Sequence, residues 1–207
     1  MGRTSDTVQS THKVVVFFDI CSSTTILEDL LRTENGRRWR NLLIGLKRFL
    51  VEERDEFGFL IYKFLGDGWV LLFDAKKIRG NQLVSFLTRL DGHYQNLFHT
   101  GICEVLGGSE HTIGITAGVD EGTLVRIIMN QQEEFIGRAL NVAARLQGAI
   151  KQKDKKPEGK ILLSKNAFVL LKVESARIRS TLVERELRNI SGGEHYQARK
   201  ISLRKKK

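Results

Sequence analysis

Residues 14–24 read VVVFFDICSST, and the interpretation of the rest of the chain starts from this stretch. Its first part, 14–20, is a continuous apolar run rich in Val and Phe, which predicts a buried strand. The polar residues 21–24 predict the start of a helix, because Ser and Thr are good N-caps. Asp19 lies at the end of the strand beside two phenylalanines, where a carboxylate is costly to bury unless it caps a helix or pairs with another group.

The other apolar patterns predict alternating strands and helices. Leucines and aromatic residues recur at spacings of three and four between residues 37 and 56, which predicts an amphipathic helix. Two short apolar runs on either side of residues 66–68 (GDG) predict a β-hairpin. Further along, we expect helices at 80–100 and 138–150, a helix capped by Ser164, and strands at 111–119, 122–129 (joined by a turn at 120–122), 161–163, 179–188 and 194–202. This order indicates one α+β domain in which helices pack on a mixed or antiparallel sheet.

Length and composition agree with a single folded domain. The chain has 207 residues, of which 41% are hydrophobic and 28% charged. We expect a flexible arm at 1–12, the domain at 13–202 and a basic tail at 203–207. No apolar run is long enough for a membrane helix and the N-terminus has no secretory core, so we expect a cytoplasmic protein with no membrane partner. Its two cysteines, Cys21 and Cys103, are expected to be free thiols.

Positive charge is concentrated in two segments. The net charge is +10; residues 151–160 carry five lysines and two acids, and residues 199–207 carry six basic residues and no acid. Such segments are solvated, or form a footprint for nucleic acid, or attract an anion such as a nucleoside triphosphate. The chain has no recognition-helix signature and no aromatic RNA-binding motif, so nucleic acid is not the favoured partner.

A second acidic residue, Asp67, lies at the tip of the predicted hairpin. An Asp-Gly pair in a hairpin is by itself ordinary turn chemistry. If the strands that carry Asp19 and Asp67 are neighbours, however, the two carboxylates meet at one edge of the sheet. Carboxylates combined with substrate phosphates are the ligands that Mg²⁺ and Mn²⁺ prefer. The two acids are therefore either structural or a site for divalent cations.

The segment 134–147, EFIGRALNVAARLQ, contains a polar pair on a predicted helix. Asn141 and Arg145 are four residues apart and share one helix face. An arginine guanidinium can bind phosphate oxygens through its planar fork. A surface arginine and a capping asparagine on an amphipathic helix would give the same pattern, so both interpretations stay open. The five histidines show no metal-ligand spacing.

Four segments in combination resemble the class III nucleotidyl cyclase catalytic domain. FFDICSST (17–24), KFLGDG (63–68) and EFIGRALNVAARLQ (134–147) stand in that family's order, and GKILLSKNAF (159–168) resembles its late strand and helix. The resemblance covers about residues 13–172. It implies a single domain with a ferredoxin-like core that converts a nucleoside triphosphate into a 3′,5′-cyclic monophosphate and pyrophosphate. It also implies two divalent cations, Mn²⁺ or Mg²⁺, as cofactors.

The resemblance assigns roles to residues on both sides of the reacting phosphate. Asn141 matches the residue that orients the ribose, and Arg145 matches the one that stabilises charge on the phosphoryl group. Lys63 and Glu134 match the pair that reads the base, and Arg188 is a weaker match to a basic residue that contacts phosphates. The implied metal ligands are Asp19, the carbonyl of Ile20 and Asp67, and the implied phosphate-binding amides are those of Ser22, Ser23 and Thr24.

The resemblance further implies a homodimer with composite active sites. In the family, the metal-binding aspartates come from one subunit, whereas the asparagine, the arginine and the base-reading pair come from the other. The reaction joins two groups of one substrate molecule, so the enzyme mainly folds and holds that substrate. No dedicated Ser or His nucleophile is needed, and the sequence shows no convincing triad.

The base is less clearly indicated than the reaction. Family members that use ATP carry Lys with Asp or Thr at the reading positions, and those that use GTP tend to carry Glu with Cys. Lys63 with Glu134 departs from both patterns. This pair provides a donor and an acceptor, which suits adenine, uracil or cytosine. Glutamate is one methylene longer than aspartate and can reach a smaller base, but from these residues alone adenine, uracil and cytosine all stay open; together with the second resemblance described next, we favour UTP, with CTP possible and ATP as the alternative.

A second resemblance concerns the biological role. Short cyclases with a DIxxST-type first motif resemble the pyrimidine cyclases of the Pycsar antiphage system, whose cyclic UMP or cyclic CMP activates a separate effector protein. This chain carries such a motif at 19–24 and shows no receptor or regulatory segment. The expectation is a uridylate cyclase that makes a second messenger in bacterial antiphage defence. The alternatives are an adenylate cyclase and a non-catalytic domain that binds nucleotides or nucleic acid.

Overall fold

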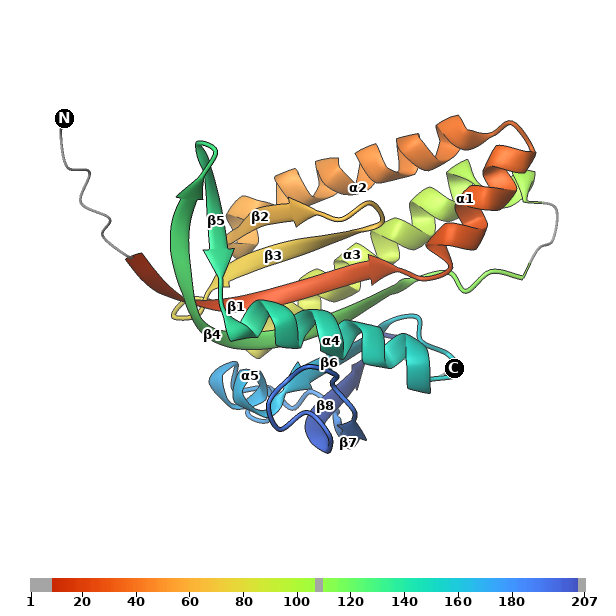
Figure 1. Cartoon of the computed structure of the whole chain (residues 1–207). Coiled ribbons are helices and arrows are strands. Elements are labelled where there is room, and N and C mark those ends of the chain that lie inside the picture. Colours follow the sequence, from red (N-terminus) through yellow and green to blue (C-terminus); the bar gives the residue numbers. More distant parts are fainter. Residues whose placement is uncertain (1–8, 107–109, 205–207) are drawn as a thin grey trace, which may run out of the picture.

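The computed structural model describes residues 9–106 and 110–204 (Figure 1). Eight strands form one sheet in the order β2-β3-β1-β4-β6-β8-β7, and β5 pairs with β4 outside this path. The elements in chain order are β1 (Gln9–Ile20), α1 (Ser23–Arg32), α2 (Gly36–Phe57), β2 (Phe59–Phe64), β3 (Gly68–Asp74), α3 (Gly80–Gly101), the 3₁₀ turn η1 (Cys103–Val105), β4 (Ile115–Met129), β5 (Gln132–Ile136), α4 (Arg138–Lys153), β6 (Lys160–Ser164), α5 (Lys165–Leu170), β7 (Thr181–Arg185) and β8 (Tyr196–Ser202).

Strand β1 is the centre of the sheet, as its apolar run predicts. It pairs antiparallel with β3 on one side and with β4 on the other. Val14, Val16 and Phe18 point into the larger core, whereas Val15 points into the core on the opposite face. A strand that is covered on both faces needs apolar residues at every position, which explains the unbroken run.

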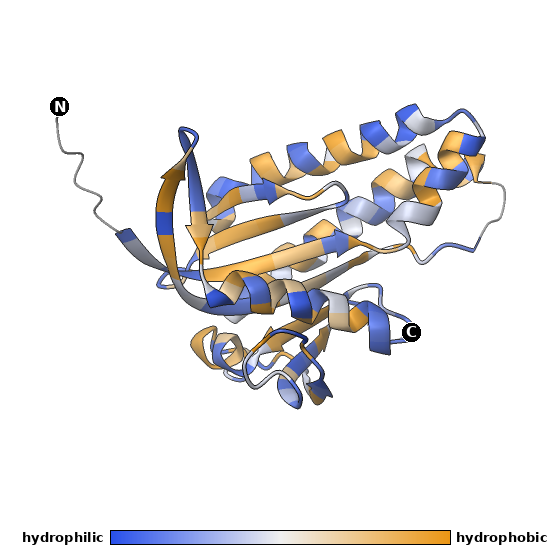
Figure 2. Cartoon of the chain, in the orientation of Figure 1, coloured by the Kyte–Doolittle hydropathy of each residue, from blue (hydrophilic) through white to orange (hydrophobic). Residues whose placement is uncertain are grey.

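The helices cover the two faces of the sheet unequally. α1, α2 and α3 pack their apolar sides on one face, where most of the core residues lie. α4 packs alone across the other face, over β1, β4 and β6 (Figure 1). In Figure 2 the strands of the central sheet are mostly orange, whereas the helices show orange on some turns and blue on others. The expectation of an α+β domain with helices packed on a mixed sheet is confirmed, since β4 and β6 are parallel and the other neighbours antiparallel.

Most of the predicted elements are present, but the turn expected at residues 120–122 is wrong. β4 runs through these residues without a break, because β1 pairs with it along its whole length, from Gln9 to Ile20. The chain turns instead at Asn130 and Gln131, which both have positive φ, and returns as the short strand β5, which the sequence pattern did not predict. A long ladder of backbone hydrogen bonds here outweighs the local turn preference of Asp and Gly.

Both ends of the domain are more firmly attached than expected. Residues 9–12 belong to β1, so they are not part of an arm; residues 1–8 lie outside the described part of the chain. In the predicted tail, Leu203 donates its amide to the Gly159 carbonyl, and Arg204 pairs with the buried Asp91 at 2.8 Å. A buried carboxylate needs a charged partner, which explains why Arg204 folds back. Residues 205–207 also lie outside the described part.

Among residues 9–106 and 110–204, we find no helix with the length and apolar character that crossing a membrane requires.

Candidate active site

The two predicted metal-binding aspartates lie side by side at one end of the sheet. Asp19 pairs with Gly68 in the β1–β3 ladder, and the Ile20 amide donates to the Asp67 carbonyl at 3.2 Å. Gly68 makes this approach possible, since a Cβ there would lie 2.3 Å from the Phe18 carbonyl oxygen. The hairpin glycine therefore serves a close contact between strands, and it places Asp67 beside the end of β1.

The Asp19 carboxylate is largely buried and lies between an acidic and a basic neighbour. Burial raises the pKa of its carboxyl above the usual value, the Lys151 ammonium group opposes that rise, and the nearby carboxylate of Asp67 adds to it. Its Oδ1 atom is buried and has no hydrogen-bond partner in the part of the chain that the structure describes. A buried carboxylate oxygen without a partner is unfavourable and marks a place where a cation or a donor fits.

The loop after β1 has a different capping chemistry from the one predicted. Helix α1 starts at Ser23, as expected, but Ser22 adopts a left-handed conformation (φ 53°) and its side chain does not cap the helix. The Ser23 hydroxyl instead donates to the Asp67 carboxylate. The amides of residues 22–24 precede the first intrahelical bond, from the Ile26 amide to the Ser22 carbonyl, so they have no acceptor inside α1. Free amides at a helix start favour an anion.

Two side chains from α4 complete this cluster, and the sequence analysis missed both. The Lys151 Nζ atom lies 2.5 Å from Asp19 Oδ2 and 3.0 Å from the Ile20 carbonyl oxygen. The Gln147 amide donates to Asp19 Oδ2 at 3.3 Å and to the Thr116 hydroxyl at 2.8 Å. The predicted helix ends at residue 150, but α4 extends to residue 153 and so includes Lys151. The signal was present, because residues 143, 147 and 151 follow one another at a spacing of four along one side of the helix, where 143 and 147 are buried and 151 lies at the exposed end.

The predicted base-reading pair forms a second cluster, on β2 and β5. Lys63 Nζ lies 2.8 Å from Glu134 Oε2, and the Tyr62 hydroxyl donates to the same oxygen at 2.6 Å. The hydrogen bond from Lys63, and to a smaller extent that from Tyr62, lowers the pKa of Glu134. The hydrogen bond between Lys63 and Glu134 also raises the pKa of Lys63. Both groups therefore stay charged near neutral pH. Tyr62, which the sequence motifs did not indicate, thus joins Lys63 and Glu134 in a cluster of three residues.

Asn141 and Arg145 lie on the exposed side of α4, as their spacing predicts. In the described residues neither side chain makes a hydrogen bond or an ion pair, whether with Asp19, with Asp67 or with any other residue. Arg188 is also exposed, with only Glu186 near it at 3.6 Å. The residues predicted to act on the ribose and phosphate are thus presented to the outside of one chain.

The cluster at the end of β1 suits a hard divalent cation that shares its ligands with a substrate. Residues 9–106 and 110–204 contain no group of three or more His, Cys, Asp or Glu side chains that could hold a metal on its own. The two carboxylates, of which Asp19 has an unpartnered buried Oδ1, and the Ile20 carbonyl nevertheless provide only oxygen donors. Mg²⁺ is usually held by one or two carboxylates together with waters and substrate phosphates, so this donor set fits.

Solved structures share this architecture. The adenylyl cyclase CyaB from P. aeruginosa superimposes with a TM-score of 0.71 at 20% identity, over 96% of this chain and 97% of that chain. The guanylyl cyclase Cya2 gives a TM-score of 0.65 at 15% identity, over 94% and 92%. The chain has the fold of a nucleotidyl cyclase catalytic domain. A bacterial light-regulated adenylyl cyclase also has this cyclase fold (TM-score 0.69, 16% identity), and our chain spans 56% of its length.

Sequence comparisons identify no relatives of this chain. No model of a protein family matches the chain, and no curated protein sequence does. The structural neighbours include enzymes named for adenylate and enzymes named for guanylate, so the cyclase fold alone does not determine the base.

The two cysteines differ in exposure. Both are free, but Cys21 is buried next to the loop after β1 and Cys103 is exposed. Burial raises the pKa of the Cys21 thiol to about 12. Because only the thiolate is nucleophilic, we expect iodoacetamide at mildly alkaline pH to alkylate Cys103 in the native protein and to spare Cys21. Peptide mass spectrometry measures both sites, and denatured protein, in which both should react, is the control. Equal labelling in the native state would contradict the burial of Cys21.

Proposed function

We propose that this protein is a nucleotidyl cyclase whose metal and phosphate half-site is the cluster at the end of β1. The observation that carries the proposal is the convergence of Asp19, Asp67 and the Ile20 carbonyl beside the loop at residues 22–24. The same oxygens in another fold would indicate only a cation site. In a chain with the cyclase fold, they support phosphoryl transfer within a nucleoside triphosphate.

The reaction consists of one substitution at phosphorus. The ribose 3′ oxygen attacks the α-phosphorus and loses its proton, the bond from the α-phosphorus to the bridging oxygen breaks, and pyrophosphate leaves. Amides of residues 22–24 bind the phosphates, Asn141 orients the ribose, and Arg145 stabilises the charge that develops on the phosphoryl oxygens. Divalent ions held by Asp19 and Asp67 would supply further positive charge beside the reacting groups.

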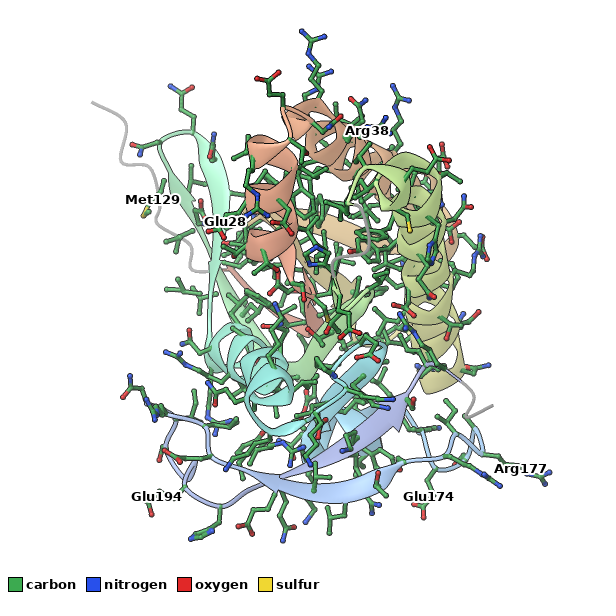
Figure 3. All side chains as sticks on the ribbon, turned by 90° about the vertical axis from the view of Figure 1, so that its right-hand side faces the viewer. Glu28, Arg38, Met129, Glu174, Arg177 and Glu194 are labelled. Carbon is green, nitrogen blue, oxygen red and sulfur yellow. The ribbon has the colours of Figure 1, made fainter. Side chains whose placement is uncertain are left out.

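A homodimer with composite sites is part of this proposal. Asn141 and Arg145 are exposed and have no partner in the described residues, so they are available to a second chain. The β4–β5 arm exposes Ile128, Met129 and Ile136 (61%, 55% and 52%). Figure 3 shows Met129 on this arm at the side of the molecule. Exposed apolar residues gathered in one arm are typical of a surface that another protein covers. An apolar groove of about 600 Å³ between α2 and β2, lined in part by Trp39 and Trp69, adds to this surface.

We propose a pyrimidine triphosphate, with UTP favoured over CTP, as the substrate. Tyr62 and Lys63 both bind Oε2 of Glu134, and in the described residues no hydrogen bond reaches its Oε1 atom. Glu134 therefore has an acceptor free for the ring N–H of uracil while Lys63 faces a neighbouring carbonyl. The Tyr62 ring packs edge-on against Phe135, with centroids 5.4 Å apart, so the glutamate has a rigid support. Adenine presents a similar donor beside an acceptor, and ATP is the second candidate.

A product assay tests this proposal directly. We expect purified protein with Mn²⁺ to convert UTP into cyclic UMP at the highest rate, CTP more slowly, and ATP and GTP at least about tenfold more slowly, because a mispaired base leaves Lys63 or Glu134 without its hydrogen-bond partner on the substrate. Chromatography with mass spectrometry identifies each product. Cyclic AMP as the main product would agree with the proposed cyclase activity but would reject a pyrimidine triphosphate as the substrate. No cyclic product from any of the four would reject the cyclase itself.

The signalling role stays a prediction from the sequence resemblance. In a Pycsar-type system the cyclic pyrimidine nucleotide activates a separate effector protein. The product assay decides whether this role is worth testing, because an enzyme that makes cyclic AMP would not fit it.

A further inference from the structure

The ammonium group of Lys151 lies where the proposed metal ligands converge. Its Nζ atom lies 2.5 Å from Asp19 Oδ2 and 3.0 Å from the Ile20 carbonyl oxygen, two of the three oxygens assigned to metal binding. The side chain reaches this point from the last turn of α4 and is 33% exposed. A cation supplied by the chain itself thus already contacts the ligand set.

A divalent ion and Lys151 cannot both use these oxygens. Divalent ions of this kind sit roughly 2.0–2.6 Å from their oxygen ligands. An ion bound to both Asp19 Oδ2 and the Ile20 carbonyl would therefore use the same two oxygens that the ammonium nitrogen now contacts at 2.5 and 3.0 Å. Two positive charges bound to the same oxygens repel each other strongly. Asp19 Oδ1, which has no partner in the described residues, remains available in either state.

We infer that the Lys151 ammonium group is an intramolecular counter-ion that occupies the metal position of the ion-free protein, and that it must leave Asp19 and Ile20 when a divalent cation binds. The inference rests on the proposed metal site and assigns a regulatory residue to it. Lys151 thereby lowers the affinity for free metal, while it spares the protein the cost of an unpaired buried carboxylate.

The surroundings allow this exchange. Lys151 is at the end of a helix and partly exposed, so its flexible stem can carry the ammonium group into solvent. Gln147 stays behind: it is buried, and its amide is anchored on Thr116 Oγ1 at 2.8 Å while it also contacts Asp19 Oδ2. The carboxylate thus keeps a neutral donor that orients it after the ammonium group has left.

Metal binding without nucleotide tests the inference. We expect Lys151→Met to bind Mn²⁺ about tenfold more tightly than the wild type in calorimetric titration, because the competing charge is gone. Lys151→Arg keeps the charge and should bind close to the wild-type Kd. Lys153 lies in the same last turn of α4 but, in the described residues, makes no ion pair with Asp19, so Lys153→Met is the matched control and should also leave the Kd unchanged.

Thermal unfolding provides a second readout that does not depend on turnover. In EDTA, Lys151→Met should unfold at a lower Tm than the wild type, since Asp19 loses its charged partner, and Mn²⁺ should raise its Tm by more than it raises that of the wild type. Lys151→Gln, which retains a donor, replaces the methionine variant if the latter does not fold. If the wild type binds Mn²⁺ and the uncharged variants bind it equally or more weakly, the inference about Lys151 is wrong, but the proposed metal site is not affected. Absence of Mn²⁺ binding in every variant also overturns the inference, whereas the proposed metal site, which relies in addition on substrate phosphates, is rejected only if the product assay yields no cyclic nucleotide.

Discussion

Asp67→Asn lowers the rate of cyclic nucleotide formation by about 10³-fold and leaves the fold intact. The substitution removes one negative charge from the half-site that would hold the divalent ions, and electrostatic contributions of this kind carry several orders of magnitude in rate. The fold should survive because the asparagine carbonyl oxygen can still accept the Ser23 hydroxyl, which now binds the carboxylate. Product formation from the preferred triphosphate, measured with Mn²⁺ at saturation, reports the loss.

A surface variant separates this effect from a general change of charge. Asp55 lies on α2 with its side chain 85% exposed, so Asp55→Asn removes the same charge far from the cluster and should retain wild-type turnover. Circular dichroism and Tm should match among the three proteins. Turnover near the wild-type level in Asp67→Asn would mean that this carboxylate is only a turn residue of the hairpin, and the metal half-site would then be wrong.

Two inactive variants, Asp67→Asn and Arg145→Ala, regain activity when they share a dimer. Each variant damages a different half of the composite site, so a mixed dimer contains one intact site and one doubly damaged site. A heterodimer purified through two different tags should therefore turn over at about half the wild-type rate per dimer. Each homodimer should be at least about 100-fold slower than the wild type, since Arg145 is assigned to the charge that develops in the transition state.

The matched control pairs two variants of the same half-site. In a heterodimer of Asp67→Asn with Asp19→Asn, each of the two composite sites contains one damaged metal half-site, so the heterodimer should stay inactive. Recovery in this control, or no recovery in the Asp67→Asn and Arg145→Ala heterodimer, would argue against sites shared between subunits. A wild-type protein that is monomeric by light scattering under assay conditions and still active would lead to the same conclusion.

The candidate site was predictable to the extent that its residues follow short motifs. Asp19 and Asp67 each stand at a strand end that the local pattern indicates, and the β1–β3 ladder brings them together as the hypothesis requires. Lys63 and Glu134, which are 71 positions apart, also meet. What the motifs did not indicate is the set of neutral and basic partners, Tyr62 beside Glu134 and Lys151 beside Asp19, because their neighbours in space come from distant segments.

Local turn chemistry was the least reliable signal in this chain. The residues 120–122 look like a turn and lie in the middle of a continuous strand, while the real turn at Asn130 and Gln131 was not expected. Ser22 similarly has the residue type of an N-cap but adopts a left-handed conformation, so its hydroxyl does not cap α1. Tertiary contacts replaced the local ones in both places: β1 pairs with residues 120–122, and the Thr112 amide donates to the Ser22 hydroxyl oxygen at 3.3 Å.

By itself, the sequence determined the class of the domain, the order of most strands and helices, and the two acidic strand ends, since hydrophobic periodicity and turn residues act over a few neighbouring positions. Only the tertiary structure decided that Lys151 reaches Asp19 from 132 residues away, that β4 continues through its apparent turn, and that Arg204 closes on Asp91. These contacts depend on which strands become neighbours and on which buried charge needs a partner. Both follow from the packing of the whole sheet, which no local pattern encodes.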